Sequence, residues 1–268
     1  MRVFVCPSLA LPPSSSAMSP VLYDAAMTVL PKNYEVHVKG AVAHYWETLG
    51  VQGKKRAAGS ADRGSRSAVT GGKQMDGFCQ LVRWVVIENG MPAASVHTTN
   101  SLELPGYFRP TKKWDLVVVH EHRLVAAIEF KSQAGPSFGN NFNNRTEESI
   151  GNAVDIAVAC REGAYGSTAP RPWVGWIMVV EECPGSTKAV RVDEPHFNVF
   201  EDFRGASYAA RYELLMRRLL LEKHYDGASL LLSPRGSEGI YQEPAADLSM
   251  KRFLASLGGH VQSFLASF

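Results

Sequence analysis

The sequence WDLVVVHEHRLVAAIEFK, residues 114–131, contains the pattern that decides the fold. Two apolar runs of strand length, Trp114–Val119 and Leu124–Lys131, are separated by the polar residues HEHR. Short apolar runs bounded by polar turn residues are typical of buried β-strands. The segment therefore predicts a β-hairpin or a closely related pair of strands.

Three charged residues stand at the ends of these two runs. Asp115 begins the first run, and Glu129 and Lys131 end the second. Side chains alternate along a strand, so Glu129 and Lys131 point to the same side and can meet Asp115 across the hairpin. A buried strand normally avoids unpaired charge, because burying a charge costs free energy. The three residues therefore predict a functional cleft where the two strands emerge.

The chemistry that these residues suit is phosphodiester cleavage. Asp115 and Glu129 supply hard oxygen ligands for Mg²⁺, with the backbone carbonyl of Phe130 as an additional ligand. Lys131 would orient the attacking water and offset negative charge at phosphorus. The pattern resembles that of PD-(D/E)xK nucleases, with Trp114 where proline commonly precedes the first acid. Alone, an acid-x-Lys spacing is more often an exposed ion pair, so the interpretation depends on the surrounding sequence.

Helical and strand patterns alternate along the rest of the chain. Apolar residues at helical spacing predict helices over residues 20–30, 41–49, 75–89, 146–160, 207–225 and 247–268, and VGWIMVV (174–180) predicts another buried strand. Interleaved helices and strands favour an α/β fold with a mixed β-sheet flanked by helices. We expect a single domain, 1–268, with N-terminal helices and a basic loop in 1–75, a catalytic core in 76–190 and a helical C-terminal segment in 191–268.

Residues 50–74 form a Gly-, Ser- and Ala-rich segment with a local excess of positive charge, which includes Lys54, Lys55 and Arg56. The composition predicts a flexible loop, which in an arbitrary protein is usually a solvated linker. In a nuclease, such a loop can follow phosphates and become ordered on DNA. The segment does not contain the GxxxxGK[ST] pattern of a nucleotide-binding P-loop.

A second polar segment follows the charged strand. Residues 132–148, SQAGPSFGNNFNNRTEE, are expected to form a loop before a helix that Thr146 caps. Gln133 continues the side of the strand that carries Glu129 and Lys131. Because asparagine pairs with adenine and arginine with guanine in the major groove, five further residues are candidate base contacts: Asn140, Asn141, Asn143, Asn144 and Arg145. Loop propensity alone also collects such residues, and both interpretations stay open.

Composition sets broad limits. Hydrophobic residues make up 45% and charged residues 20% of the 268 residues, as in ordinary globular enzymes. The net charge of +2 gives no strong overall field for a polyanion, so any nucleic-acid surface must be local. The four cysteines form no CxxC pair and predict neither a zinc site nor a disulfide framework. Prolines interrupt the mildly apolar N-terminus, so we expect no signal peptide, no membrane association and an intracellular protein.

The segment from Trp114 to Asp155 resembles the XhoI-type family of type II restriction endonucleases, through WDLVVV and AAIEFKSQAGPSFGNNFNNRTEESIGNAVD. The resemblance implies a PD-(D/E)xK restriction-endonuclease-like core and homodimeric, Mg²⁺-dependent cleavage of double-stranded DNA at the palindrome CTCGAG. It also implies a bacterial cytoplasmic location, and a cognate DNA methyltransferase in the same system that forms no stable complex. In this superfamily a further acidic ligand often precedes the first strand. Glu88 and Glu103 are the candidates, and both can equally be surface acids.

Two other functions fit the same residues. A repair or junction-resolving nuclease on the same core would share the catalytic groups but would not recognise a base sequence. A non-catalytic DNA-binding protein would use the basic and Asn-rich segments, with the acidic pair merely structural. Digestion of defined DNA with Mg²⁺ separates these possibilities.

Overall fold

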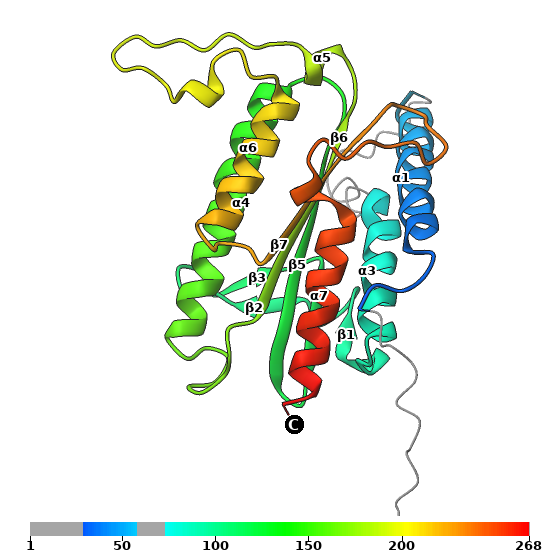
Figure 1. Ribbon diagram of the computed structural model, residues 1–268, viewed down its shortest axis with the longest axis vertical. Helices are drawn as coiled ribbons and strands as arrows, with labels where there is room; N and C mark the ends of the chain where they lie inside the picture. The colour runs from blue at the N-terminus through cyan, green and yellow to red at the C-terminus, as the bar shows by residue number, and fades with distance from the viewer. Residues whose placement is uncertain (1–28, 58–72, 268) are drawn as a thin grey trace, which may run out of the picture.

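The structure is a computed structural model that describes residues 29–57 and 73–267, with the backbone alone for residues 52–57. A mixed five-stranded sheet lies at its centre in the order β1-β4-β5-β6-β7 (Figure 1). These strands are β1 (Val96–His97), β4 (Leu116–His120), β5 (Arg123–Gln133), β6 (Trp173–Glu181) and β7 (Gly227–Ser233). A separate two-stranded sheet pairs β2 (Glu103–Pro105) with β3 (Thr111–Lys113).

The predicted hairpin is the antiparallel pair β4 and β5. Its register joins Leu116 to Ile128 at one end and His120 to Arg123 at the other. The two residues between the strands, Glu121 and His122, both have positive φ, 48° and 61°. A two-residue loop of this kind matches the right-handed twist of the flanking strands. Local chain geometry therefore fixes the register that brings Asp115 toward the middle of β5.

The other half of the sheet is parallel. β6 pairs with β5, and β7 pairs with β6, in parallel registers. All nine residues of β6 and all seven of β7 are buried, as expected for strands covered on both faces. The predicted mixed sheet is thereby confirmed. β7 lies in the segment for which the sequence predicts only helices.

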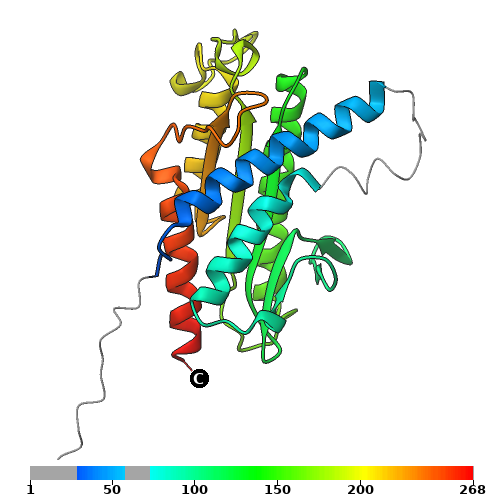
Figure 2. The same cartoon turned by 90° about the vertical axis from the view of Figure 1, so that its right-hand side faces the viewer.

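Helices cover both faces of the sheet (Figure 1). One apolar core joins one face to α1 (Tyr34–Ala57), α3 (Asp76–Glu88) and α7 (Met250–Leu265), and a second core joins the opposite face to α4 (Phe138–Arg161) and α6 (Tyr208–Leu221). Strand residues alternate between the two cores, so that Ile128 belongs to the first and Ala127 to the second. Figure 2 shows α1 running along α3 on the first face.

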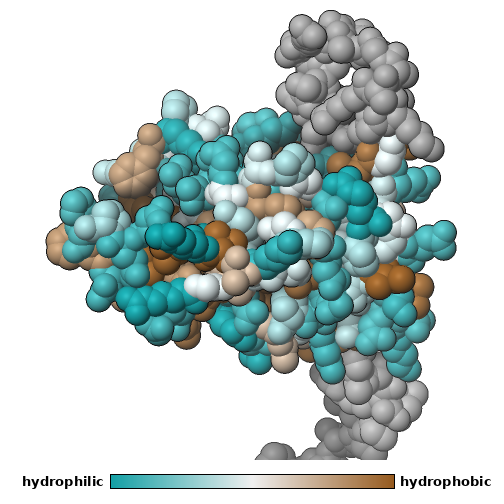
Figure 3. All heavy atoms as spheres, turned by 90° about the horizontal axis from the view of Figure 1, so that it is seen from above, coloured by the Kyte–Doolittle hydropathy of each residue, from teal (hydrophilic) through white to brown (hydrophobic). Residues whose placement is uncertain are grey.

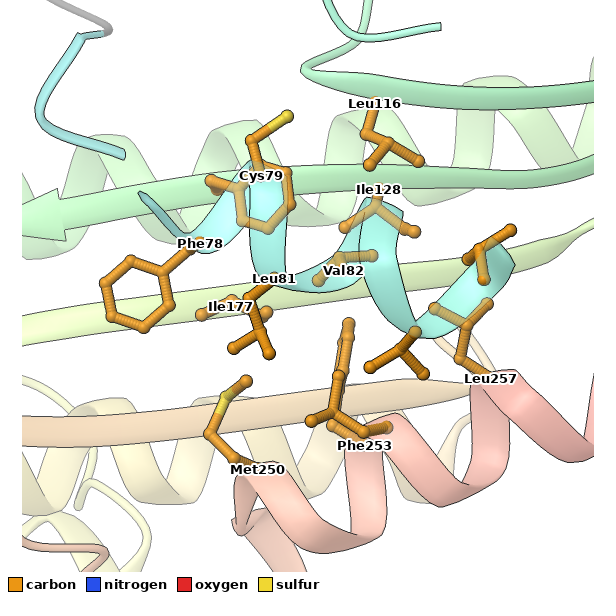
Figure 4. Close-up of a cluster of buried hydrophobic side chains, with 14 of the residues drawn as sticks. Phe78, Cys79, Leu81, Val82, Leu116, Ile128, Ile177, Met250, Phe253 and Leu257 are labelled. Atoms are coloured by element: carbon orange, nitrogen blue, oxygen red, sulfur yellow. The ribbon is translucent and has the colours of Figure 1, made fainter. Parts of the chain in front are cut away.

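The first core is the larger packed region beside the hairpin. Figure 4 shows Val82 of α3 beside Ile128 of β5, and Leu81 of α3 beside Ile177 of β6, with Met250, Phe253 and Leu257 of α7 below them. The remaining short elements are α5 (Pro184–Thr187) and the 3-10 turns Lys73–Met75, Ala93–Ser95, Glu201–Phe203 and Ala246–Leu248. Within the described ranges, no helix combines the length and apolar character needed to cross a membrane.

Most of the predicted helices that fall in the described ranges are confirmed, but the bounds of the two predicted loops are wrong. The loop predicted over residues 50–74 is helical as far as Ala57, because α1 continues through it, and residues 58–72 lie outside the described part. The loop predicted over residues 132–148 ends at Ser137, since α4 begins at Phe138. Residues 20–28 of the first predicted helix lie outside the described part, and residues 29–30 form a bend.

Candidate active site

The site forms where the β4–β5 ladder ends and β5 continues along β6. The last paired residues are Leu116 and Ile128, while β5 stays paired with β6 as far as Gln133. Asp115 lies just beyond the ladder. Its amide donates to the carbonyl of Ile128 at 3.3 Å, and its Oδ2 accepts a hydrogen bond from the amide of Phe130 at 2.8 Å. The Asp115 side chain thus accepts a hydrogen bond that a backbone carbonyl would accept if the β4–β5 ladder continued.

Glu129 is the most buried charged group of the site, with 4% of its surface exposed. Its two carboxylate oxygens contact two lysines from different strands. Oε1 lies 2.5 Å from Nζ of Lys131 on β5, and Oε2 lies 2.7 Å from Nζ of Lys112 on β3. Two ion pairs of this kind offset part of the desolvation cost of burying a carboxylate.

Burial and nearby charge set the protonation of Asp115. Burial and, second to it, the nearby Glu129 carboxylate raise the pKa of Asp115 to about 6, although the hydrogen bond from the Phe130 amide opposes both. Asp115 is therefore mainly ionised at pH 7 and above, and becomes protonated as the pH falls below 6. Sharing of one region by two acids is the arrangement that a cation would stabilise.

Lys131 stays charged in this setting. Burial alone would lower its pKa, but Glu129, Asp115 and Glu148 together outweigh burial and raise the pKa above its ordinary value. A second acid, Glu148 of α4, lies 3.8 Å from the same ammonium group. Lys131 is thus a fixed positive charge at the mouth of the site, with a quarter of its side chain exposed.

Helix α4 forms the opposite wall. A small cavity between β5 and this helix is lined by Glu129, Lys131, Arg145, Glu148, Ser149, Asn152, Trp176 and Tyr225. Arg145 donates from Nη1 to Glu148 at 2.5 Å, but its buried Nε has no hydrogen-bond partner. The buried Nε2 of Gln133 has none either, although its Oε1 accepts from the hydroxyl of Tyr212 at 3.4 Å. Two predicted DNA contacts, Arg145 and Gln133, therefore retain unused donors.

The asparagines occupy the first two turns of α4 rather than a loop. Asn140, Asn143 and Asn144 are exposed, whereas the amide of Asn141 donates back to the carbonyl of Ser137 at 3.1 Å. Thr146 is not a cap: its hydroxyl donates to the carbonyl of Phe142 within the helix. The helix therefore holds the predicted base-contacting residues on a rigid support, at its N-terminal end.

Both candidates for a further acid lie away from these groups. Cys79 marks the part of α3 near the site, with Sγ 3.9 Å from the carbonyl of Asp115, and Glu88 lies roughly 13 Å further along the helix and is exposed. Glu103 pairs opposite Lys113 in the β2–β3 hairpin, on the face away from Lys112. The predicted extra ligand is thus not brought to the site from either position.

The nearby residues that the sequence did not single out are Lys112 and Glu148. They precede the hairpin and follow the Asn-rich segment, in TKKWD and RTEES. The KK pair before Asp115 was the available signal for Lys112. Lys54, Lys55 and Arg56 lie in the last turns of α1, where the structure describes the backbone alone. Their predicted contact with DNA remains a prediction.

Asp155 on α4 holds the loop between β2 and β3 in position. Asp155 accepts hydrogen bonds from the amides of Tyr107 and Phe108 at 2.8 and 2.9 Å, and from Nε of Arg109 at 2.7 Å. Burial tends to raise the pKa of Asp155, but these donors outweigh it and lower the pKa. These hydrogen bonds to Asp155 hold the β2–β3 hairpin against α4, and so help to place Lys112 beside Glu129.

The oxygen ligands that the site offers fit a hard divalent cation that completes its coordination shell with water and phosphate. Among the residues that the structure describes, no group of three or more His, Cys, Asp or Glu side chains is placed to enclose a metal ion. Two carboxylates and one strand carbonyl are instead available, and Mg²⁺ is usually held by one or two carboxylates together with substrate phosphates. The residues present therefore fit Mg²⁺ better than a soft or fully enclosed metal.

A mixed sheet with helices on both faces, and two acids meeting a lysine where one strand outlasts its neighbour, define a restriction-endonuclease-like core. The family described as restriction endonuclease XhoI matches residues 54–243. The chain belongs to this family of type II restriction endonucleases, enzymes that cleave DNA at specific sites. The predicted resemblance is confirmed.

Three curated relatives support this assignment. Type II restriction enzyme BstVI of Geobacillus stearothermophilus is 52% identical over 214 residues, which cover 77% of this chain and 95% of the relative. Type II restriction enzyme XhoI of Xanthomonas vasicola is 46% identical over 207 residues, 75% of this chain and 81% of the relative. Type II restriction enzyme AbrI of Azospirillum brasilense is 50% identical over 167 residues, 62% and 74%. No solved structure matches the chain significantly.

Proposed function

We propose that this protein cuts both strands of double-stranded DNA at a palindromic sequence in a Mg²⁺-dependent reaction. The observation that carries the proposal is the meeting of Asp115, Glu129 and Lys131 at the end of the β4–β5 ladder. Asp115 lies beside the first residue of β4 and Glu129 lies on β5, and burial together with the Glu129 charge raises the pKa of Asp115. Such a pair has a clear use where a cation and a phosphate meet.

Asp115 and Glu129 would hold the cation together with the carbonyl of Phe130. The amide of Phe130 already donates to Asp115, and the N–H and C=O of a strand residue point to the same edge, so this carbonyl faces the same side as the Asp115 carboxylate. When bound, Mg²⁺ polarises a phosphoryl oxygen and lowers the pKa of an attacking water. Lys131 orients that water through its ammonium group and stabilises negative charge at phosphorus.

Sequence recognition is assigned to the α4 wall of the site. Arg145 on α4 and Gln133 at the end of β5 have buried donors without a partner, and four exposed or half-buried asparagines lie at the N-terminal end of α4: Asn140, Asn141, Asn143 and Asn144. Arginine can bind guanine through two hydrogen bonds, and asparagine can bind adenine in the same way. Phosphate contacts at Lys54, Lys55 and Arg56 would add affinity without sequence information.

A hydrophilic surface near these elements supports a charged partner. From above, the upper end of the molecule, where α4 begins, shows mostly hydrophilic side chains, with hydrophobic ones in small separate groups (Figure 3). Protein surfaces that bind DNA are more polar than those that bind proteins. A homodimer would present one such surface to each half of a palindrome, and the resemblance to the XhoI-type family favours CTCGAG.

The setting that follows is a bacterial cytoplasm with a cognate DNA methyltransferase that protects the host sequence and acts separately. The test of function is digestion of a sequenced plasmid with purified protein, with Mg²⁺ and with EDTA in parallel. We expect discrete fragments whose ends map to CTCGAG, in the Mg²⁺ sample alone. Discrete fragments ending at another sequence would correct the recognition site but keep the enzyme class.

The two rival functions give different results in the same digest. A repair or junction-resolving nuclease would produce nicks at branched or damaged structures, or a smear on intact plasmid. A non-catalytic DNA-binding protein would leave the plasmid uncut at every Mg²⁺ concentration while still shifting it in a gel. Either result would reject the proposal.

A further inference from the structure

Lys112 makes a contact that the proposed reaction does not use. Its Nζ lies 2.7 Å from Oε2 of Glu129 and 3.0 Å from the carbonyl of Lys113. The same ammonium lies 4.8 Å from the centre of the Trp114 ring, and 11% of the side chain is exposed. A lysine with this burial and three favourable partners is held in place as part of the site and is not a mobile surface charge.

The charges around Glu129 are balanced by this residue. Asp115 and Glu129 carry two negative charges, and Lys112 and Lys131 carry two positive ones, so the four groups are neutral together when both acids are ionised. Each oxygen of Glu129 already contacts an ammonium group. A divalent cation that binds Glu129 would bring a third centre of positive charge to one carboxylate, and like charges at such short range repel.

We propose that Lys112 occupies the Oε2 side of Glu129 in place of the divalent cation and yields that position when the cation binds. The inference rests on the proposed Mg²⁺-dependent function and names the group that the ion must displace. Lys131 keeps its contact with Oε1, because it lies two residues from Glu129 on the same strand. From that position it can orient the attacking water. Lys112 therefore holds the carboxylate in place before the metal arrives and lowers the affinity of the site for metal in the absence of DNA.

The backbone of β3 need not move for this exchange. Asp155 and Asn152 anchor the adjoining loop through Arg109, and the flexible four-carbon stem of a lysine lets its ammonium swing while the strand stays fixed. A displaced ammonium at the edge of a phosphate-binding cleft has a new partner in a DNA phosphate. Because coupling between two ligands is reciprocal, DNA would then strengthen metal binding and metal would strengthen DNA binding.

The test is a calorimetric titration of Mg²⁺ into the full chain without DNA, which measures binding and not activity. We expect Lys112→Met to bind Mg²⁺ about tenfold more tightly than the wild type, the scale of one charge-assisted hydrogen bond. The matched control is Lys113→Met, which removes the same charge one residue away, on the opposite face of the hairpin and exposed. It should change the affinity by less than about twofold, as a screened surface charge does.

Equal affinities for the two variants, or weaker binding by Lys112→Met, would overturn the inference, since a merely structural role for Lys112 predicts weaker binding. If Lys112→Met does not fold, Lys112→Gln, which keeps a polar donor without the charge, must show the gain instead. Glu129→Gln separates the two levels of the account. If Lys112→Met shows no Mg²⁺ binding that adding Glu129→Gln removes, the inference fails, whereas the proposed function fails only if wild-type protein also leaves plasmid DNA uncut in Mg²⁺.

Discussion

Asp115, the proposed metal ligand on the β4 side of the site, is a buried carboxylate whose charge is unfavourable in the metal-free fold. Its pKa of about 6 means that ionising this side chain is harder in the folded protein than in the unfolded chain. For an acid whose folded-state pKa is raised, the stabilising contribution is complete below the unfolded pKa and is lost as the pH rises through the folded one. At pH 8 the charged form is therefore a cost that bound metal would offset.

We predict that Asp115→Asn stabilises the metal-free protein at pH 8. Asparagine still offers an oxygen to the Phe130 amide but carries no charge to bury. After discounting for partial exposure, the gain in unfolding free energy should be on the order of 1–2 kcal/mol at pH 8, and should shrink as the pH falls from 8 to 5. Urea denaturation in EDTA at both pH values measures it, with exposed Asp193→Asn as the control. A loss of stability at pH 8 would contradict the raised pKa.

Among individual residues, the sequence predicts those whose contacts follow from strand geometry. Glu129 and Lys131 meet because they are two apart on one strand, and Asp115 meets them because the hairpin turn fixes its register. Lys112 was not predictable in the same way. Its contact with Glu129 depends on a second hairpin that Asp155 anchors, and Asp155 lies forty residues beyond Asp115 in the sequence. Such a contact is set by tertiary packing, which no local pattern encodes.

At the scale of elements, α4 shows why the Asn-rich segment was predicted as a loop. Asparagine and glycine have low helix propensity and are common in turns, and residues 139–144 contain five of them. Tertiary packing overrides that preference, because Phe138 is buried and stacks near Tyr208 of α6, while Phe142 packs on Tyr212. β7 was missed for a related reason: GASLLLS has weak strand propensity but is buried throughout.

The loop of the β2–β3 hairpin gives a prediction about an element's position. A Cβ at Gly106 would lie 2.6 and 2.9 Å from the carboxylate oxygens of Asp155, too close to keep the three hydrogen bonds that the loop makes there. We expect Gly106→Ala to lower the unfolding free energy by about 1–3 kcal/mol. Gly151→Ala, on α4 in open space, should instead be neutral or stabilising. Thermal melts compare the two, and an equally stable Gly106→Ala would show that the contacts of Asp155 with the loop are not rigid.

The N-terminal half of α4 gives a prediction about recognition. Arg145→Ala should weaken binding to cognate DNA at least tenfold more than binding to random duplex, since one bidentate contact to guanine is worth about 1–3 kcal/mol. Arg161→Ala, at the exposed C-terminal end of the same helix, is the matched control. Neutralising Lys54, Lys55 and Arg56 together should weaken both kinds of binding and flatten the salt dependence. Gel-shift titrations in EDTA on both duplexes decide, and equal losses for both sets would reject this division.

At the scale of the whole molecule, the five-stranded sheet and its two helical layers follow from the alternation of helix and strand patterns, and this part of the fold was predictable from sequence. Assembly is not encoded by those patterns. A palindrome offers two identical half-sites. Two copies of the protein related by a two-fold axis can therefore place one active site on each of the two DNA strands.

We therefore predict a homodimer on DNA. Light scattering of an uncleaved complex, formed in EDTA with a duplex that carries one CTCGAG, should give the mass of two chains and one duplex. A duplex with one base pair of that sequence changed serves as the control and should not assemble at the same concentration. A complex of one chain with the cognate duplex would reject the dimer.

We propose that Asp115, Glu129 and Lys131 together carry out metal-dependent cleavage. The most direct measurement is the single-turnover rate of cleavage in Mg²⁺ for Asp115→Asn, Glu129→Gln and Lys131→Ala, beside the exposed control Glu103→Gln and with circular dichroism on each variant. We expect each of the three to lose at least about a hundredfold in rate while the control keeps the wild-type rate. In EDTA the two acid variants should bind cognate DNA at least as tightly as wild type, because a carboxylate without its cation repels phosphate. A folded variant of any of the three that cuts at close to the wild-type rate would contradict the account.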